Sequence, residues 1–98
     1  MQGVALAWNA EKNQMLKEQR GLAFEDVAAA IAKGQLVDDV PHPSEKFPHQ
    51  RMLVVKMAGY TCLVPYVQDG ETKFLKTLYK SRKSHRRYGQ TTENDRQT

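Results

Sequence analysis

The feature that most limits the fold of this chain is a change of hydrophobic period at Gly34. Before this glycine, apolar residues recur three and four positions apart, which is the spacing of a helix with one buried face. After it, short β-rich runs alternate with clusters of turn residues. Helices followed by antiparallel strands are typical of an α+β domain, in which the helices cover one face of a sheet. With 98 residues the chain has room for one such domain.

Two helices are expected before Gly34. Residues 10 to 20 follow Asn9, which is a favourable N-cap, and they end at a glycine that suits a left-handed C-cap. Residues 24 to 33 carry an apolar stripe and have acidic residues in the first turn. The cap position of this second helix is Ala23, whose side chain has no acceptor, and we expect this to cost about 1 kcal/mol relative to Ser or Thr.

Four strands are expected after the helices, at residues 36 to 40, 52 to 57, 60 to 67 and 72 to 79. Asp69-Gly70 is the strongest hairpin signal in the chain, and it joins the last two strands. Pro65 cannot donate to a ladder, so we expect an edge position or a bulge there. The prediction is an α+β fold with two N-terminal helices packed on a four-stranded antiparallel sheet.

A short basic turn or helix is expected after the last strand, at residues 81 to 88. Residues 89 to 98 contain no large apolar residue, so we expect a disordered tail. The single domain would then span residues 1 to 88.

Positive charge is concentrated at the end of the chain. The net charge is +4, and residues 73 to 98 hold eight of the 15 Lys and Arg residues but only two acidic ones. Phe74, Tyr79 and other apolar residues lie between these cations, which favours ordered structure. Such a segment is typical of a surface that binds a polyanion, because each cation placed on a phosphate releases a counterion. A solvated basic tail is the alternative interpretation.

Several other classes of protein do not fit the sequence. No run approaches the roughly 20 apolar residues of a bilayer span, and residues 1 to 10 do not resemble a signal peptide, so we expect a cytoplasmic protein without a membrane partner. Cys62 is the only cysteine, which indicates a small core residue rather than a disulfide or a zinc cluster. His42 and His49 by themselves are a weak metal signal. We expect neither a metal nor a cofactor.

Five short motifs, in the same order along the chain, resemble those of the BrnT-like toxins of bacterial type II toxin–antitoxin systems. They are WNAEKN from residue 8, RGLAFEDV from residue 20, QRMLVV from residue 50, LVPYV from residue 63, and FLKTLYKSRK from residue 74 followed by Tyr88. The similarity covers about residues 8 to 88. It implies a RelE-like fold, ribonuclease activity, and a DNA-binding antitoxin of the BrnA type as the partner. Operator DNA would be bound only through that antitoxin.

The implied reaction suggests which residues to examine. A metal-independent ribonuclease needs a base that activates the ribose 2′-hydroxyl, cations that stabilise the charged phosphorane, and an acid for the leaving oxygen. Arg51 and Arg82 are the candidate cations because a guanidinium offers a planar fork to phosphate oxygens. Lys76 would support them, and His49 is the candidate acid or base because histidine titrates near neutral pH. The residues expected to bind RNA are Lys73, Lys80, Lys83, His85, Arg86, Arg87 and Tyr88.

These assignments have structural alternatives. Arg51 could equally form an ion pair with a nearby acidic residue. The acidic candidates are Asp38, Asp39 and Glu45. Lys76 could be a lysine that extends from a half-exposed sheet, and a histidine on a loop is more often a solvated residue.

The resemblance also leaves two other functions open. A RelE-like or ParE-like toxin without hydrolytic activity would act by binding a protein such as gyrase. An inactive relative would only bind nucleic acid. Both would keep the sheet and the basic surface, because a fold does not determine a function.

Overall fold

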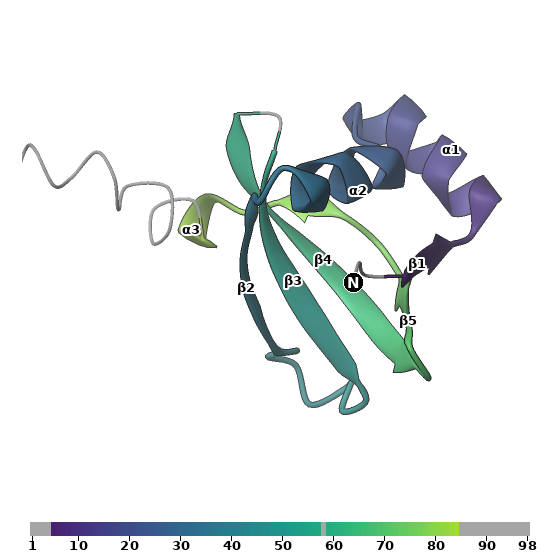
Figure 1. Ribbon diagram of the computed structural model, residues 1–98, viewed down its shortest axis with the longest axis vertical. Coiled ribbons are helices and arrows are strands. Elements are labelled where there is room, and N and C mark those ends of the chain that lie inside the picture. The colour runs from purple at the N-terminus through teal and green to yellow at the C-terminus, as the bar shows by residue number, and fades with distance from the viewer. Residues whose placement is uncertain (1–4, 58, 85–98) are drawn as a thin grey trace, which may run out of the picture.

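Two N-terminal helices pack against one mixed sheet (Figure 1). The computed structural model describes residues 5–57 and 59–84. In chain order the elements are β1 (Ala5–Trp8), α1 (Ala10–Arg20), α2 (Phe24–Ala32), β2 (Leu36–Pro41), β3 (Gln50–Met57), β4 (Tyr60–Asp69), β5 (Thr72–Leu75), β6 (Tyr79–Lys80) and α3 (Arg82–Ser84). The expected α+β architecture is confirmed. The expected RNA contacts at residues 85 to 88 and the expected tail at residues 89 to 98 lie outside the described residues.

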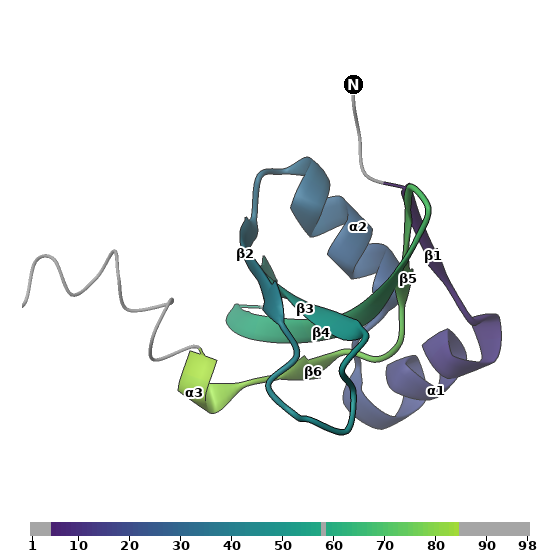
Figure 2. The ribbon, with the colours of Figure 1, turned by 90° about the horizontal axis from the view of Figure 1, so that it is seen from below.

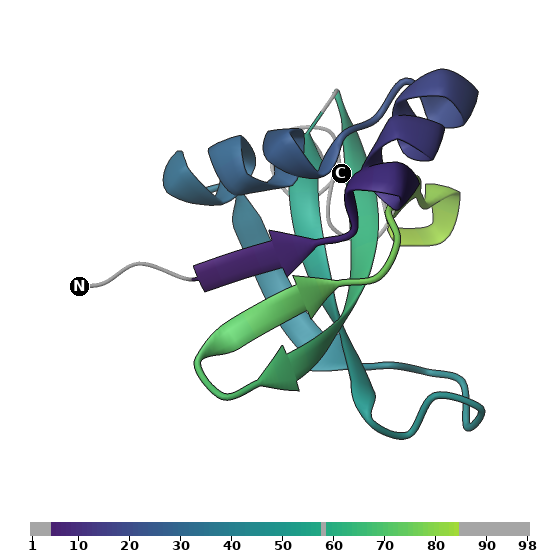
Figure 3. The same ribbon diagram turned by 90° about the vertical axis from the view of Figure 1, so that its right-hand side faces the viewer.

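The sheet differs from the expected one in strand number and direction. It has six strands in the order β1-β5-β4-β3-β2, with β6 paired to β4. β1 runs parallel to β5, as Figure 3 shows, and the other pairings are antiparallel. The prediction of a four-stranded antiparallel sheet is therefore wrong. The sequence does not reveal β1 because its four residues carry too little pattern, and its partner strand comes near the other end of the chain.

The strand expected at residues 72 to 79 is interrupted opposite Pro65. β4 pairs first with β6 and then with β5, and residues 76 to 78 belong to neither strand. Pro65 has no N–H to donate, and its carbonyl accepts a hydrogen bond from the Lys76 N–H at 2.8 Å. Pro65 therefore lies at neither an edge nor a bulge, which differs from the expectation: β4 is an interior strand whose pairing with β3 is continuous through the proline, and the break is on the side of β5 and β6.

The hydrophobic core lies between the helices and the sheet, which curls around α2 (Figure 2). Phe24 of α2 and Tyr66 of β4 are the largest buried side chains, with exposed fractions of 0% and 1%. Trp8 of β1 stacks on Phe24, with 5.7 Å between the ring centroids. An aromatic pair of this kind contributes about 0.5 to 1.5 kcal/mol beyond the area it buries. The unexpected strand therefore closes one side of the core.

The N-terminus of α2 is capped by a residue of α1 and not by Ala23 at its own N-cap position. Ala23 makes no side-chain hydrogen bond, as expected. Asn13 of α1 takes over this role: its Oδ1 accepts a hydrogen bond from the Phe24 N–H at 2.8 Å, and its Nδ2 donates to the Glu25 carboxylate at 2.9 Å. Asn13 is only 5% exposed, so its bond to the Phe24 N–H is buried, whereas its bond to Glu25 ends on an exposed carboxylate. The helix is therefore capped through tertiary structure, and the expected loss of stability is offset.

Candidate nucleic-acid interface

Exposed cations surround β6 and the short α3. Lys76, Lys80, Arg82 and Lys83 are all exposed. Between the residues that the structure describes, ion pairs form at Lys17–Glu25 and Arg51–Asp39, and neither pair includes these four cations. Their charge is therefore presented to solvent, as an RNA-binding surface requires.

Aromatic rings stand beside two of these cations. The Lys76 Nζ lies 5.2 Å from the centroid of the Phe74 ring, and the Lys80 Nζ lies 6.0 Å from that of Tyr60. Cation–π contacts at exposed sites contribute about 0.5 to 1 kcal/mol each, so they orient the ammonium groups only weakly. Cations next to half-exposed rings are a combination that suits single-stranded RNA, which is bound through phosphates and stacked bases.

A groove joins this surface to the sheet face opposite the helices. Met52 and Val54 alternate along β3 with the core residues Leu53 and Val55, so they face the other side of the sheet. Together with apolar residues of β2 and β4 they line a cavity of about 370 Å³, and its rim includes Lys83 of α3. The groove therefore brings Lys83 next to an apolar surface that also contains the acidic side chain of Asp38.

Arg20 is a further cation at this end of the molecule and is not one of the sequence-based candidates. Its Nη1 donates to the carbonyl oxygen of Leu78 at 2.7 Å. Arg20 also lines a depression of about 510 Å³ together with Leu22, Tyr79 and Lys80. Burial raises the pKa of Tyr79, and the positive charge of Arg20 partly opposes that effect. The sequence has no signal for this contact, because the bonded residues lie 58 positions apart.

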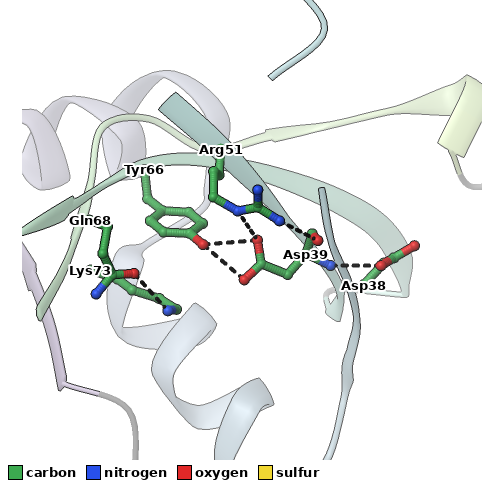
Figure 4. A network of polar contacts seen from close by, with 6 residues as sticks. All are labelled: Asp38, Asp39, Arg51, Tyr66, Gln68 and Lys73. Carbon is green, nitrogen blue, oxygen red and sulfur yellow. Dashed lines mark hydrogen bonds and ion pairs between the residues drawn. The ribbon is translucent and has the colours of Figure 1, made fainter. Parts of the chain in front are cut away.

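Arg51 belongs to a separate polar network on the helix-covered face of the sheet (Figure 4). Its Nε donates to the Asp39 Oδ1 at 3.1 Å, and its Nη2 donates to the Asp39 backbone carbonyl at 2.9 Å. The Tyr66 hydroxyl donates to the same carboxylate and lies 2.8 Å from both of its oxygens. The structural alternative for Arg51, an ion pair, is thus present, and Asp39 is the partner.

The register of three strands brings this network together. Asp39 pairs with Leu53, and Arg51 pairs with Tyr66 on the neighbouring strand. Residues that pair across strands point to the same face, so the three polar side chains share the face of the buried Leu53 and Tyr66. The hydrogen bond to Asp39 raises the pKa of Arg51, and burial, followed by the bond to Asp39, raises that of Tyr66.

The structure does not bring the two candidate arginines together. Arg51 pairs with Tyr66 on β4. Lys80, which comes two residues before Arg82, pairs with Cys62 on the same strand. Four residues of β4 separate these rows, which is roughly 13 Å at the usual rise of a strand. Arg51 and Arg82 therefore do not form one compact catalytic pair.

Lys76 and His49 are also apart from the arginine network. The Lys76 ammonium lies over Phe74, which pairs with Val67 and so faces the side of the sheet opposite Tyr66. His49 is exposed on the loop that precedes β3. Lys76 lies close to Arg51 along the strands, because its N–H donates to the carbonyl of Pro65, next to the row of Arg51. The Lys76 ammonium is nevertheless on the opposite face of the sheet.

The remaining chemistry-bearing side chains have structural partners. His42 Nδ1 accepts a hydrogen bond from the Ser44 N–H at 3.0 Å, and its ring lies 4.9 Å from that of Phe47. Cys62 is buried in the core, as expected, and burial raises the pKa of its thiol. Across residues 5–57 and 59–84, no three metal-ligating side chains form a group. Within the same ranges, no helix is long and apolar enough to cross a membrane.

Comparison with known protein families and curated proteins identifies no relative of this chain. No family profile matches the sequence, and a search of curated proteins gives no significant match. The function is therefore inferred from the chemistry of the two sites and from the motifs.

Proposed function

We propose that this protein is a ribonuclease toxin of a type II toxin–antitoxin system, with a RelE-like fold and a BrnA-type antitoxin as its partner. The observation that supports this most is the group of exposed cations around β6 and α3, which have no acidic partner among the described residues. They lie beside aromatic rings and an apolar groove, as a surface for single-stranded RNA requires.

The proposed reaction cleaves the RNA backbone through its own 2′-hydroxyl. A base removes the hydroxyl proton, the 2′-oxygen bonds to phosphorus, and the bond from phosphorus to the 5′-oxygen breaks as an acid protonates that oxygen. Arg82 and the nearby lysines stabilise the extra negative charge on the phosphorane. His49 remains the sequence-based candidate for proton transfer, although it lies at the opposite end of the sheet from Arg82.

The antitoxin would neutralise the toxin by covering the basic surface. An acidic or amphipathic segment complements the cations between Lys73 and Arg87 and excludes RNA from them. The antitoxin also supplies the DNA-binding domain, so operator DNA is bound by the complex and not by the toxin alone.

Induced expression tests the proposal, with and without the neighbouring gene. Wild type is compared with Arg82→Ala and Arg51→Ala, and with Lys46→Ala as a control on the exposed loop between β2 and β3. Growth and total RNA integrity are measured in the same cultures. We expect growth arrest with RNA loss, rescue by the neighbouring gene, a strong effect of Arg82→Ala and none of Lys46→Ala.

One observation favours a second candidate function, a toxin that binds a protein target without hydrolysis. Arg51 is engaged by Asp39, and His49 is distant from Arg82, so the described residues do not form a complete acid–base site. In the expression experiment, growth arrest with intact RNA would support this alternative. No arrest would contradict both toxin functions and leave a protein that only binds nucleic acid.

A further inference from the structure

Two polar side chains that are not among the candidate site residues meet at the C-terminal end of α1. Arg20 and Tyr79 line the same depression of about 510 Å³, together with Leu22 and Lys80. We propose that Arg20 and Tyr79 together bind a backbone phosphate of single-stranded RNA, next to the basic surface around β6 and α3. This inference rests on the proposed function, because it extends the surface on which that RNA would lie.

Arg20 is anchored at one nitrogen and open at the others. Its Nη1 donates to the backbone carbonyl of Leu78 at 2.7 Å, in the segment between β5 and β6 (Figure 2). A guanidinium carries five N–H hydrogens, and this bond is the one that Arg20 forms within residues 5–57 and 59–84. Nε and Nη2, which form the side fork of the guanidinium, are therefore available to two oxygens of a phosphate. Arg20 is exposed, so a ligand can reach this fork.

Tyr79 presents a half-buried hydroxyl that has no hydrogen-bond partner among the described residues. Burial raises the pKa of this phenol, so the hydroxyl stays protonated and can donate to a phosphate oxygen. The positive charge of Arg20 opposes that rise, so the guanidinium acts on the hydroxyl from nearby. Burying a hydroxyl without a partner costs free energy, and a ligand oxygen in the depression would remove that cost.

The charge around the depression favours an anion. No acidic side chain lines it among the described residues, and Arg20 is in neither of the ion pairs that these residues form. The acidic residue nearest to Arg20 in the sequence is Glu18, which accepts a hydrogen bond from Gln14 at 3.0 Å. Lys80 adds positive charge to the wall. We assign it no contact with this phosphate, because its ammonium lies 6.0 Å from the centroid of the Tyr60 ring.

RNA fits this position better than an acidic protein segment does. The depression continues the basic surface, since Arg82 of α3 comes three residues after Tyr79. Successive phosphates of one strand could therefore contact Arg20 and the cations around α3. The half-exposed rings of Tyr60 and Phe74 stand beside cations of the same surface, and bases can stack on such rings, whereas acidic side chains cannot.

Fluorescence anisotropy of the full chain with a labelled 2′-O-methyl oligouridylate tests the contact, because this RNA lacks the hydroxyl that the proposed reaction needs. Arg20→Lys keeps the charge but removes the fork, and we expect it to weaken binding about tenfold. Tyr79→Phe removes only the hydroxyl, and we expect it to weaken binding about threefold. Lys12→Gln removes a charge from the same helix outside the depression, and it should have no effect.

Urea unfolding of Tyr79→Phe separates a binding role from a structural one. Because the hydroxyl has no partner among the described residues, its removal should not lower the free energy of unfolding. A clear loss of stability would show that the hydroxyl is used within the protein, and it would overturn the proposed contact. Thermal unfolding verifies that Arg20→Lys, which loses the bond to Leu78, is folded.

The remaining outcomes separate this inference from the proposed function. RNA binding that depends on Arg82 but is equal in wild type, Arg20→Lys and Tyr79→Phe would overturn the contact and leave the ribonuclease proposal intact. Binding that depends on Arg20 and Tyr79, with intact RNA in the expression experiment, would support the contact and contradict the ribonuclease proposal. The contact is also overturned if an oligoglutamate of equal charge binds as tightly as the RNA, or if the RNA does not bind.

Discussion

Asn13 is the residue whose role differs most from what its place in the sequence suggests. It lies in the middle of α1, yet it caps α2 by accepting a hydrogen bond from the Phe24 N–H. Asn13→Ala leaves this buried N–H without a partner, and we expect the free energy of unfolding to fall by about 1 to 3 kcal/mol. Urea unfolding measures this change directly, and the midpoint of thermal unfolding should fall by about 4 to 8 °C per kcal/mol.

A second substitution tests whether the missing cap explains that loss. Ala23→Ser adds a local acceptor at the cap position of α2. It should recover part of the lost stability when combined with Asn13→Ala, and it should add little to wild type because the cap is already supplied. Equal stabilisation of both proteins would show that Asn13 is not the cap.

Glu25 gives a prediction about pH at the same contact. The hydrogen bond from Asn13 is the main cause that lowers the pKa of this carboxyl below its ordinary value of 4.5, and the positive charge of Lys17 acts in the same direction. The folded state therefore favours the ionised form. The resulting stabilisation is present above pH 4.5 and is lost as the pH falls through the lowered pKa.

NMR titration of the Glu25 side-chain carbons measures this shift. We expect a midpoint below 4.5 in wild type and one closer to 4.5 in Asn13→Ala. A midpoint that does not change in the variant would attribute the shift to Lys17 or to the backbone instead.

At the level of elements, the network around Asp39 links β2, β3 and β4. Asp39→Ala removes the partner of Arg51 and also leaves the Tyr66 hydroxyl without its acceptor. We expect it to cost about 1 to 3 kcal/mol, because the partly buried hydroxyl loses its hydrogen bond. Arg51→Ala should cost less, because Asp39 keeps the bond from Tyr66 and exposed ion pairs contribute little.

Equilibrium unfolding of the two variants, measured side by side, checks this order. Tyr66→Phe on its own separates the contribution of the hydroxyl from that of the ion pair. Equal losses for Asp39→Ala and Arg51→Ala would mean that the ion pair, rather than the tyrosine, makes Asp39 important.

The elements also show where sequence patterns are sufficient. α1 begins after Asn9, which accepts a hydrogen bond from the Lys12 N–H at 2.8 Å, and it ends at Gly21 with φ at 66°. Both ends were predicted because caps act within one turn of the chain. The split between β5 and β6 was not predicted, since it depends on which part of β4 each strand meets.

At the scale of the whole molecule, the basic surface predicts a dependence of RNA binding on salt. Each cation that contacts a phosphate contributes about 0.7 to the slope of log affinity against log salt concentration for a single strand. Lys80→Gln and Lys83→Gln should each reduce this slope by about that amount, and Lys46→Gln should leave it unchanged. Fluorescence anisotropy with a labelled oligoribonucleotide at several salt concentrations measures the slope. Affinity that does not vary with salt would contradict an electrostatic RNA surface.

The sequence by itself determined the features that depend on near neighbours. The helical period before Gly34, the helix caps of α1 and the β-rich runs around Asp69-Gly70 are local, so the α+β class and most element positions were predictable. The positive charge of residues 73 to 98 was also predictable, because it follows from a count of their charged residues.

Only the tertiary structure decided which distant groups meet. The parallel pairing of β1 with β5, the cap that Asn13 gives to α2, the bond from Arg20 to Leu78 and the choice of Asp39 as the partner of Arg51 all join residues at least 11 positions apart. Many distant partners are possible for each such group, and the one that is used depends on the register of the strands and on how the helices pack. For the same reason the sequence could name Arg51 and Arg82 as candidates, whereas the fold placed them in different parts of the molecule.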